Sequence, residues 1–302
     1  MTAKIKTISR YTSVYNRESI NNNEQIEQKY LTSYTEMDER GNVITDKTFN
    51  RDGSLENCIC RTFNDKNLLI QEDFLDGEDT VPYESRINEY DDNDFLVKSI
   101  VCYAEDKVEE IYHRDEQGHL LKKEVIYEDG ESNIETECVW TGDLVKRIVE
   151  YDEDGEENVI RDYQYNNEGK ITQIDMEEKS VLDKHTETYE YDNGKITQTL
   201  YNLKGKPVSV TVSVFNEQGQ LLGKTVETQT QFFKYIYSYD EQGNKKRESM
   251  LNRDDLLLND QQIEYNEFQL ETCTKSYSRN IVDNNDEMLP VEINSIEYTY
   301  WD

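Results

Sequence analysis

Hydrophobic and polar residues alternate along most of this chain. The alternation occurs in short runs, which polar segments separate. Residues 208–215 alternate valine with serine or threonine before a final phenylalanine. Pairs of tyrosines separated by one residue recur in runs of the same kind: Tyr163 and Tyr165, Tyr189 and Tyr191, and Tyr237 and Tyr239. Side chains two residues apart lie on one face of a β-strand, and Tyr, Val, Ile and Thr favour strands. The pattern therefore predicts short β-strands over most of the chain and few helices.

A turn motif separates these runs at regular intervals. It consists of an aromatic residue, Asp or Asn, one or two polar residues, Gly, a polar residue and then Leu or Ile, and clear copies begin at Tyr165, Tyr191, Phe215 and Tyr239. With weaker copies included, the motif returns about every 25 residues, and a second glycine turn such as 152–155 falls roughly halfway between copies. Glycine supplies the positive φ angle that such turns need. Each repeat therefore predicts a strand, a turn, a second strand and a second turn.

The repeats predict an all-β fold. About eleven repeats of about 25 residues, with two strands each, give about 22 strands. We expect an elongated, solenoid-like antiparallel β meander in which each repeat contacts its neighbours and charged side chains protect the edge strands. Residues 1–29 are expected to form an N-terminal cap with a degenerate first repeat, residues 30–279 the repeat array, and residues 280–302 a C-terminal capping segment and strand.

Composition adds a strong acidic charge to this picture. The 302 residues include 65 Asp and Glu against 33 Lys and Arg, for a net charge of −32 at pH 7. Only 35% of the residues are hydrophobic, which together with this charge is typical of disordered chains, but the 11% of aromatic residues indicates a folded protein. The charge excludes nucleic-acid binding through a basic surface and a polybasic membrane anchor. We therefore expect neither nucleic acid nor a membrane as a direct partner.

The sequence also predicts a cytoplasmic protein. No run approaches the length of a transmembrane helix, and the first twenty residues lack the apolar stretch of a secretory signal. The five cysteines are odd in number and irregularly spaced, which argues against a disulfide framework. Because such an acidic chain repels its own copies, a monomer is favoured.

The turn motif resembles the YD repeat of the RHS family. Residues 191–196 and 239–244 are the copies most similar to its Tyr-Asp-x-x-Gly-x-Leu unit, and the resemblance spans roughly residues 30–270. MORN-like repeats of similar length are a neighbouring possibility. Large RHS proteins build a β shell around a C-terminal toxin, whereas this sequence shows neither a toxin-sized extension nor the Pro/Asp-rich motif that ends the shell. The resemblance therefore implies a small acidic repeat protein of the kind found as immunity or antitoxin partners.

Candidate chemistry is sparse. His113 and His119 flank one turn, and Cys58 and Cys60 share one face of a predicted strand, but neither pair has further ligands at a metal-binding spacing. Residues 152–157 are similar to the start of a calcium loop with its glycine misplaced. No phosphate loop, nucleophile elbow or Ser/His/Asp arrangement is present. We therefore predict a protein that is not an enzyme and holds no metal or cofactor.

Two surface features remain as candidate binding sites. The tyrosine pairs named above either pack between strands or form an exposed aromatic face that stacks on sugar rings or a peptide. The acidic side chains either serve solubility and edge protection or contact a basic partner. The candidate contact residues form an acidic set: Glu128, Asp129, Glu131, Glu135, Glu137, Asp152, Asp154, Glu156 and Glu157.

The leading prediction is a non-catalytic cytoplasmic repeat protein whose acidic surface engages a basic protein. A toxin-like partner such as a nuclease would suit it, because a nucleic-acid groove is basic, and the chain would then act as an immunity or antitoxin-type neutraliser. The alternative is a carbohydrate- or cell-wall-binding module that uses the tyrosine-lined face. A nucleic-acid mimic and a hydrolase are further alternatives.

Overall fold

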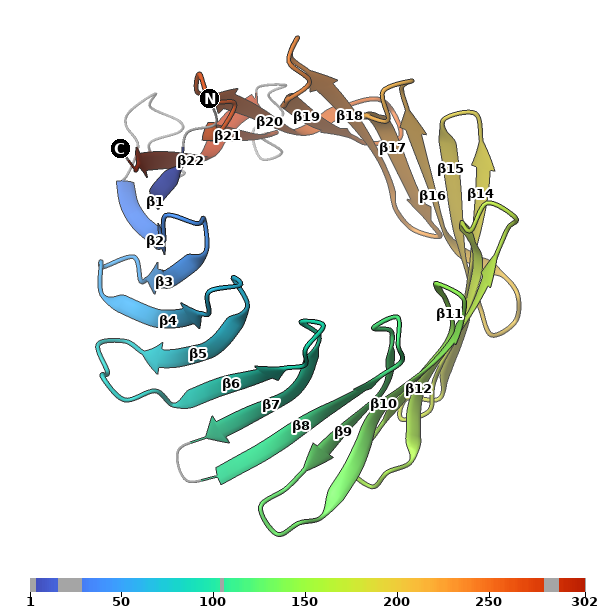
Figure 1. Ribbon diagram of the computed structural model, residues 1–302. Helices are drawn as coiled ribbons and strands as arrows, with labels where there is room; N and C mark the ends of the chain where they lie inside the picture. The colour runs from blue at the N-terminus through green and yellow to red at the C-terminus, as the bar shows by residue number, and fades with distance from the viewer. Residues whose placement is uncertain (1–3, 16–28, 104–105, 280–287, 302) are drawn as a thin grey trace. The chain divides into compact units, whose positions relative to one another are not determined.

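The protein consists of β-strands (Figure 1). The computed structural model describes residues 4–15, 29–103, 106–279 and 288–301, which form 22 strands and contain no helix. Within these residues, then, there is no helix that could cross a membrane. The predictions of an all-β fold and of two strands per repeat are confirmed.

The strands belong to two compact units. The first unit contains residues 1–83, 221–223 and 233–302, and the second contains residues 84–220 and 224–232. The first unit holds β1 (Ile5–Val14), β2 (Lys29–Met37), β3 (Val43–Phe49), β4 (Leu55–Phe63), β5 (Leu69–Asp76), nearly all of β18 (Phe232–Tyr239), β19 (Lys245–Leu251), β20 (Leu257–Tyr265), β21 (Glu271–Arg279) and β22 (Met288–Tyr300). The second holds β6 (Glu84–Tyr90), β7 (Leu96–Tyr103), β8 (Asp106–Arg114), β9 (Leu120–Ile126), β10 (Ser132–Thr141), β11 (Leu144–Tyr151), β12 (Glu157–Tyr165), β13 (Ile171–Glu178), β14 (Asp183–Asp192), β15 (Lys195–Asn202) and β16 (Pro207–Phe215), while residues of β17 (Leu221–Thr228) fall in both units.

Each unit is an antiparallel sheet in which, apart from β1 and β22, the paired strands follow one another along the chain. In the second unit, every strand from β6 to β15 pairs with the next one along the chain. In the first unit, the spatial order is β5–β4–β3–β2–β1–β22–β21–β20–β19–β18. The predicted antiparallel meander is therefore confirmed within each unit.

The pairing of β1 with β22 contradicts part of the prediction. Ile8 lies opposite Tyr298, so the first strand of the chain is hydrogen-bonded to both β2 and the last strand. The prediction of an elongated, solenoid-like array is therefore wrong. Unpaired edge strands expose backbone donors and acceptors, and pairing the terminal strands satisfies them. β1 and β22 fall within the predicted terminal segments 1–29 and 280–302, whose boundaries stay a prediction, and residues 16–28 and 280–287 lie outside the described residues.

The repeated turn has a specific hydrogen-bond pattern. In the copy at Asp240, the carboxylate oxygen Oδ1 accepts bonds from the backbone N–H of Gln242 at 3.0 Å and of Asn244 at 2.8 Å. The N–H of Gly243 donates to the carbonyl of Asp240 at 3.1 Å, and Gly243 has a φ of 90°. Short Asp and Asn side chains can bond the backbone two residues ahead, and glycine adopts positive φ without steric cost. This pattern explains why the motif contains Asp or Asn followed by Gly.

Few side chains in the described residues are buried. Among the hydrophobic ones these are Ile8, Cys58, Val101, Val149 and Ile160. Most other strand residues are half-buried. Burial therefore comes mainly from neighbouring side chains across the strands.

Candidate acidic partner-binding site

The predicted acidic residues gather at one edge of the second unit. Turns of an antiparallel meander alternate between two edges of the sheet, so the β9–β10 and β11–β12 turns share an edge. The first turn carries Glu128, Asp129 and Glu131, and the second carries Asp152, Asp154 and Glu156. The side-chain nitrogen of Asn133 donates to the carbonyl oxygen of Glu153 at 3.1 Å, which connects the two turns directly.

Two of these acidic residues stabilise the turns in which they lie. Asp129 Oδ1 accepts the N–H of Glu131 at 3.0 Å, and Asp152 Oδ1 accepts the N–H groups of Asp154 at 3.0 Å and Glu156 at 2.9 Å. Asp152 therefore caps its turn in the same way as Asp240, whereas Asp129 accepts only the N–H two residues ahead.

The other four predicted carboxylates on these turns have no such capping role. The side chains of Glu128, Glu131, Asp154 and Glu156 are exposed, and none forms an ion pair with another described residue. They form a negatively charged group along the shared edge, which we call the acidic edge. Unpaired surface charges of one sign attract an oppositely charged partner at long range.

The other three predicted acidic residues already have partners in the sheet. Glu135 pairs with Lys123 at 2.7 Å, and Glu157 pairs with Lys179 at 2.8 Å. Glu137 accepts a hydrogen bond from the Tyr151 hydroxyl at 2.8 Å; this bond, together with burial, raises the pKa of Tyr151 to about 12. The predicted acidic set therefore divides into turn residues, which are exposed to solvent, and strand residues, which already bond other side chains of the sheet.

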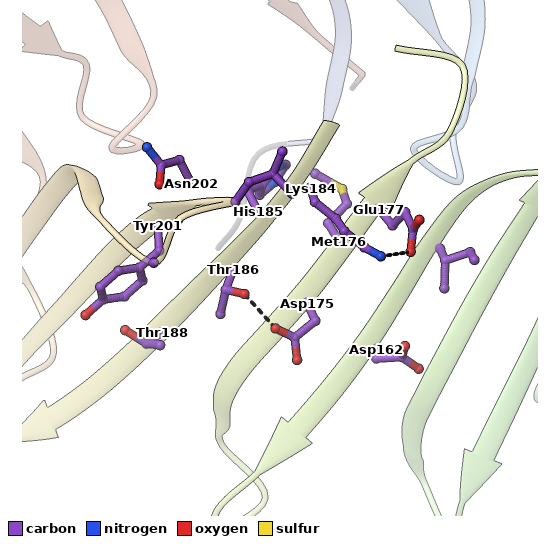
Figure 2. A pocket seen from close by; sticks show the side chains of 13 residues that line it. Asp162, Asp175, Met176, Glu177, Lys184, His185, Thr186, Thr188, Tyr201 and Asn202 are labelled. Atoms are coloured by element: carbon purple, nitrogen blue, oxygen red, sulfur yellow. Dashed lines mark hydrogen bonds and ion pairs between the residues drawn. The ribbon is translucent and has the colours of Figure 1, made fainter. Parts of the chain in front are cut away.

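A hollow of about 620 Å³ lies toward the same edge, over β12 to β15 (Figure 2). Leu203 and Gly205 of the β15–β16 turn line it, and that turn belongs to the acidic edge's side of the sheet. Across its strands Asp162 lies opposite Asp175, Asp175 opposite Thr186, and Thr186 opposite Tyr201. The remaining lining residues are Ile160, Met176, Glu177, Lys184, His185, Thr188 and Asn202. Sequence reasoning missed this site, because only the strand register brings Asp162 and Asp175 together.

The two facing aspartates are only partly compensated. Asp175 accepts neutral hydrogen bonds from the Thr186 hydroxyl and the Gln173 amide, each at 2.7 Å. Asp162 has Arg147 as its charged neighbour, with Nη1 3.4 Å from the carboxylate oxygens. Like charges directly opposite each other on a sheet are unfavourable. A positively charged group entering the hollow would relieve this repulsion.

The third carboxylate of the hollow is paired with a lysine side chain. Glu177 pairs with Lys184 at 2.6 Å, as Figure 2 shows. With three carboxylates against one ammonium group, the lining has an excess of negative charge.

Tyrosines of the turn motif connect successive repeats. Tyr165 donates its hydroxyl to the carbonyl of Val145 at 2.7 Å, and Tyr191 donates to that of Ile171 at 2.8 Å. The same type of bond recurs elsewhere: Tyr239 to Leu221, Tyr265 to Lys245, Trp140 to Leu120 and Arg114 to Leu96. Each acceptor lies at or next to the start of the strand that follows the preceding motif turn. The aromatic position of the motif therefore ties one repeat to the one before it.

The other predicted tyrosines are half-buried strand residues. Burial raises the pKa of Tyr163 and, with a smaller contribution from Glu248, raises that of Tyr237 to about 12. Burial and a 2.6 Å hydrogen bond to Glu187 raise the pKa of Tyr189.

The six tyrosines do not share one unit. Tyr163, Tyr165, Tyr189 and Tyr191 belong to the second unit, and Tyr237 and Tyr239 belong to the first. Tyr163 and Tyr189 follow Asp162 and Thr188, which line the hollow, so their rings lie on the opposite face of the sheet. Ligand binding by these tyrosines stays a prediction.

The two histidines flagged by the sequence have protein partners. His113 Nε2 lies 3.1 Å from Glu124, and His119 bonds Asp115 at 2.9 Å while its ring stacks on Trp140 at 4.5 Å. In the part of the chain that the structure describes, no three His, Cys, Asp or Glu side chains are grouped to hold a metal ion.

Comparisons with known proteins identify no family. No family model and no curated protein matches this chain. A crystal structure of TcdB2-TccC3-Cdc42 is 14% identical, with 89% of this chain and 17% of that chain covered and a TM-score of 0.37. The Photorhabdus luminescens Tc holotoxin pore is 9% identical, with 93% and 18% covered and a TM-score of 0.39. A porin-like protein from Bacteroides uniformis is 9% identical, with 100% and 98% covered and a TM-score of 0.30.

These similarities are weak and concern β architecture alone. The chain spans less than a fifth of the two toxin chains. The repeated strands and turns described above make the chain a β-repeat protein, and a finer family assignment is a proposal.

Proposed function

We propose that this chain is a non-catalytic repeat protein of YD type that binds a basic protein through the acidic edge of its second unit. The observation that carries the proposal is that exposed carboxylates without ion pairs lie on two connected turns, beside a hollow in which Asp162 faces Asp175. The net charge of −32 supports the same polarity for the partner.

The arrangement fits recognition of basic side chains. Opposite charges steer two proteins together and can raise association rates by about 10 to 10³. An arginine side chain suits the hollow, because a planar guanidinium can bond two carboxylates at once. Its aliphatic part could pack against apolar lining residues such as Ile160 and Leu203.

A toxin-like nuclease is the partner class we favour. Enzymes that act on nucleic acids carry Lys and Arg side chains that contact phosphates. An acidic edge would compete for those side chains and block access to the substrate. The chain would then act in the cytoplasm as an immunity or antitoxin-type neutraliser.

Affinity capture with matched charge variants tests this proposal. The edge variant carries Glu128→Gln, Asp154→Asn and Glu156→Gln, which spares the capping residues Asp129 and Asp152. The control variant carries Asp92→Asn, Glu116→Gln and Glu217→Gln, three exposed carboxylates on turns at the opposite edge of the same unit. Both variants change the net charge by the same amount.

Each protein is immobilised and exposed to lysate of the source cells at about 0.1 M and 1 M salt, which differ about threefold in screening length. We expect one basic protein to be retained at low salt by the wild type and the control variant, but not by the edge variant or at high salt. Equal retention by all three proteins, retention that salt does not affect, or no retained protein would contradict the proposal.

A second candidate function is carbohydrate binding, which one observation favours. The first unit contains a hollow of about 450 Å³ lined by Tyr235 and Tyr277 together with Asn259, Gln261 and other polar side chains. Amide groups donate and accept hydrogen bonds and so can pair with sugar hydroxyls. A glycan array would show binding that Tyr277→Ala abolishes, and an array without hits would remove this candidate.

A further inference from the structure

Two thiols lie in contact on β4 in the first unit. Cys58 and Cys60 are separated by Ile59, so both side chains point to the same face of the strand. Their sulfur atoms are 3.8 Å apart, and both cysteines are free. Cys58 is buried, with 8% of its surface exposed, and Cys60 is half-buried.

This spacing matches that of two thiolates sharing one metal ion. With metal–sulfur bonds of about 2.3 Å, two sulfurs lie about 3.8 Å apart around a tetrahedral ion and about 4.6 Å apart around a linear one. The observed 3.8 Å equals the tetrahedral separation and is about 0.8 Å short of the linear one, so a two-coordinate ion requires the two sulfurs to move apart by side-chain rotation while the backbone stays in place.

A disulfide fits the same pair less well. It requires sulfurs about 2.05 Å apart and Cα atoms usually less than about 6.8 Å apart. Two positions along a strand span about 6.6 to 6.8 Å, the upper limit of that range. The geometry therefore favours a bridging ion over oxidation of the pair.

We propose that Cys58 and Cys60 form a two-thiolate site for a soft monovalent cation of the Cu(I) or Ag(I) class. Thiolates select soft metals. No third His, Cys, Asp or Glu side chain joins the two thiols in the described part of the chain, which disfavours a structural zinc site with four protein ligands. Cu(I) and Ag(I) accept two sulfur ligands.

The neighbouring strands bring mixed charges to this site. Lys47 on β3 and Leu75 on β5 lie opposite Cys58, while Thr45 and Asp73 lie opposite Cys60. The Lys47 ammonium offsets the single negative charge that two thiolates and one Cu(I) would carry, while Asp73 and Asp46, which lies opposite Ile59, oppose it.

Binding is coupled to proton release. Two thiols and one Cu(I) ion give a bis-thiolate complex and two protons, with no change in oxidation state. Affinity should therefore rise with pH.

Competition for Cu(I) tests the site. The purified full chain is titrated anaerobically with Cu(I) against the chelator bathocuproine disulfonate. Cys58→Ser and Cys60→Ser are compared with Cys138→Ser, a control on β10 that also removes one of the five thiols. Far-UV circular dichroism verifies the fold of every variant, and Cys60→Ser, at the less buried position, keeps the test informative if Cys58→Ser misfolds.

We expect one tightly held Cu(I) per wild-type chain, unchanged in Cys138→Ser and weakened by roughly 100-fold in a folded Cys58→Ser or Cys60→Ser variant. X-ray absorption should show two sulfur neighbours. Equal affinity in all variants, an equal loss in Cys138→Ser, or failure of the wild type to compete with the chelator would overturn the proposal. This site is independent of the proposed acidic edge.

Discussion

Substitution of Tyr165 by Phe isolates the bond that ties one repeat to the next. The Tyr165 hydroxyl donates to the Val145 carbonyl at 2.7 Å, across 20 residues of sequence. Tyr163 offers a control on the same strand, because its hydroxyl forms no hydrogen bond with another described residue. Both substitutions remove one oxygen and leave the aromatic ring in place.

The expected loss follows from the contact that disappears. A typical hydrogen bond contributes about 0.5 to 1.5 kcal/mol net to the free energy of unfolding. Tyr165 and Val145 are both half-buried, so water replaces the hydroxyl only in part. We expect Tyr165→Phe to lower the free energy of unfolding by about 1 kcal/mol and Tyr163→Phe to change it by less than about 0.5 kcal/mol.

Urea unfolding at 25 °C, followed by far-UV circular dichroism, measures both values. The two variants and the wild type should share one slope against urea concentration, so that midpoint shifts report stability directly. If Tyr165→Phe unfolds at the same midpoint as Tyr163→Phe, the inter-repeat bond does not contribute as the structure indicates, and this explanation of the motif's aromatic position fails.

Three further substitutions test the turns, the buried charge and the core. Gln269 has a φ of 62° where most other copies carry glycine, so Gln269→Gly should stabilise the protein by about 0.5 to 1 kcal/mol in urea unfolding, and an unchanged midpoint would argue against strain there. Burial alone would raise the pKa of Asp260, but hydrogen bonds from Arg247 and Ser249 outweigh it and hold the pKa below its usual value. The resulting stability is present above the unfolded pKa of about 3.9 and is lost as pH falls through the folded pKa. Asp260→Asn should therefore cost roughly 1 to 3 kcal/mol at pH 7 and progressively less as the pH falls below about 3.9, and a cost independent of pH would be inconsistent with this. Val101 is 1% exposed, so Val101→Ala should lower the free energy of unfolding by roughly 1.5 to 3 kcal/mol, as measured by calorimetry. A negligible loss would show that the surrounding side chains move in and fill the space.

Local rules made the strands and turns predictable from sequence. The alternation around Tyr189 and the Asp240–Gly243 turn depend on contacts between residues close in the chain, so their patterns are visible without a structure. Degenerate copies such as the one at Tyr265 could still be placed by spacing, although Gln269 replaces the glycine there and keeps a positive φ.

Long-range pairing was not predictable in the same way. The repeat pattern specifies a strand's neighbours but not whether β1 finds β22, which lie at opposite ends of the chain. The juxtaposition of Asp162 and Asp175 depends on the register of β12 and β13, and a one-residue slip would move one of them to the other face. The acidic turns were predicted, but their division into capping and free carboxylates required the hydrogen bonds of Asp129 and Asp152.

The affinity of the captured basic protein for the two matched charge variants tests the central claim most directly. Isothermal titration at about 0.1 M salt would compare the wild type, the edge variant and the control variant defined above. Our account predicts that the edge variant binds about tenfold or more weakly than the wild type, while the control variant stays within about threefold, because only the edge carboxylates contact the partner. Equal weakening of both variants would show that net charge alone drives the association, and an unchanged edge variant would place the binding site elsewhere.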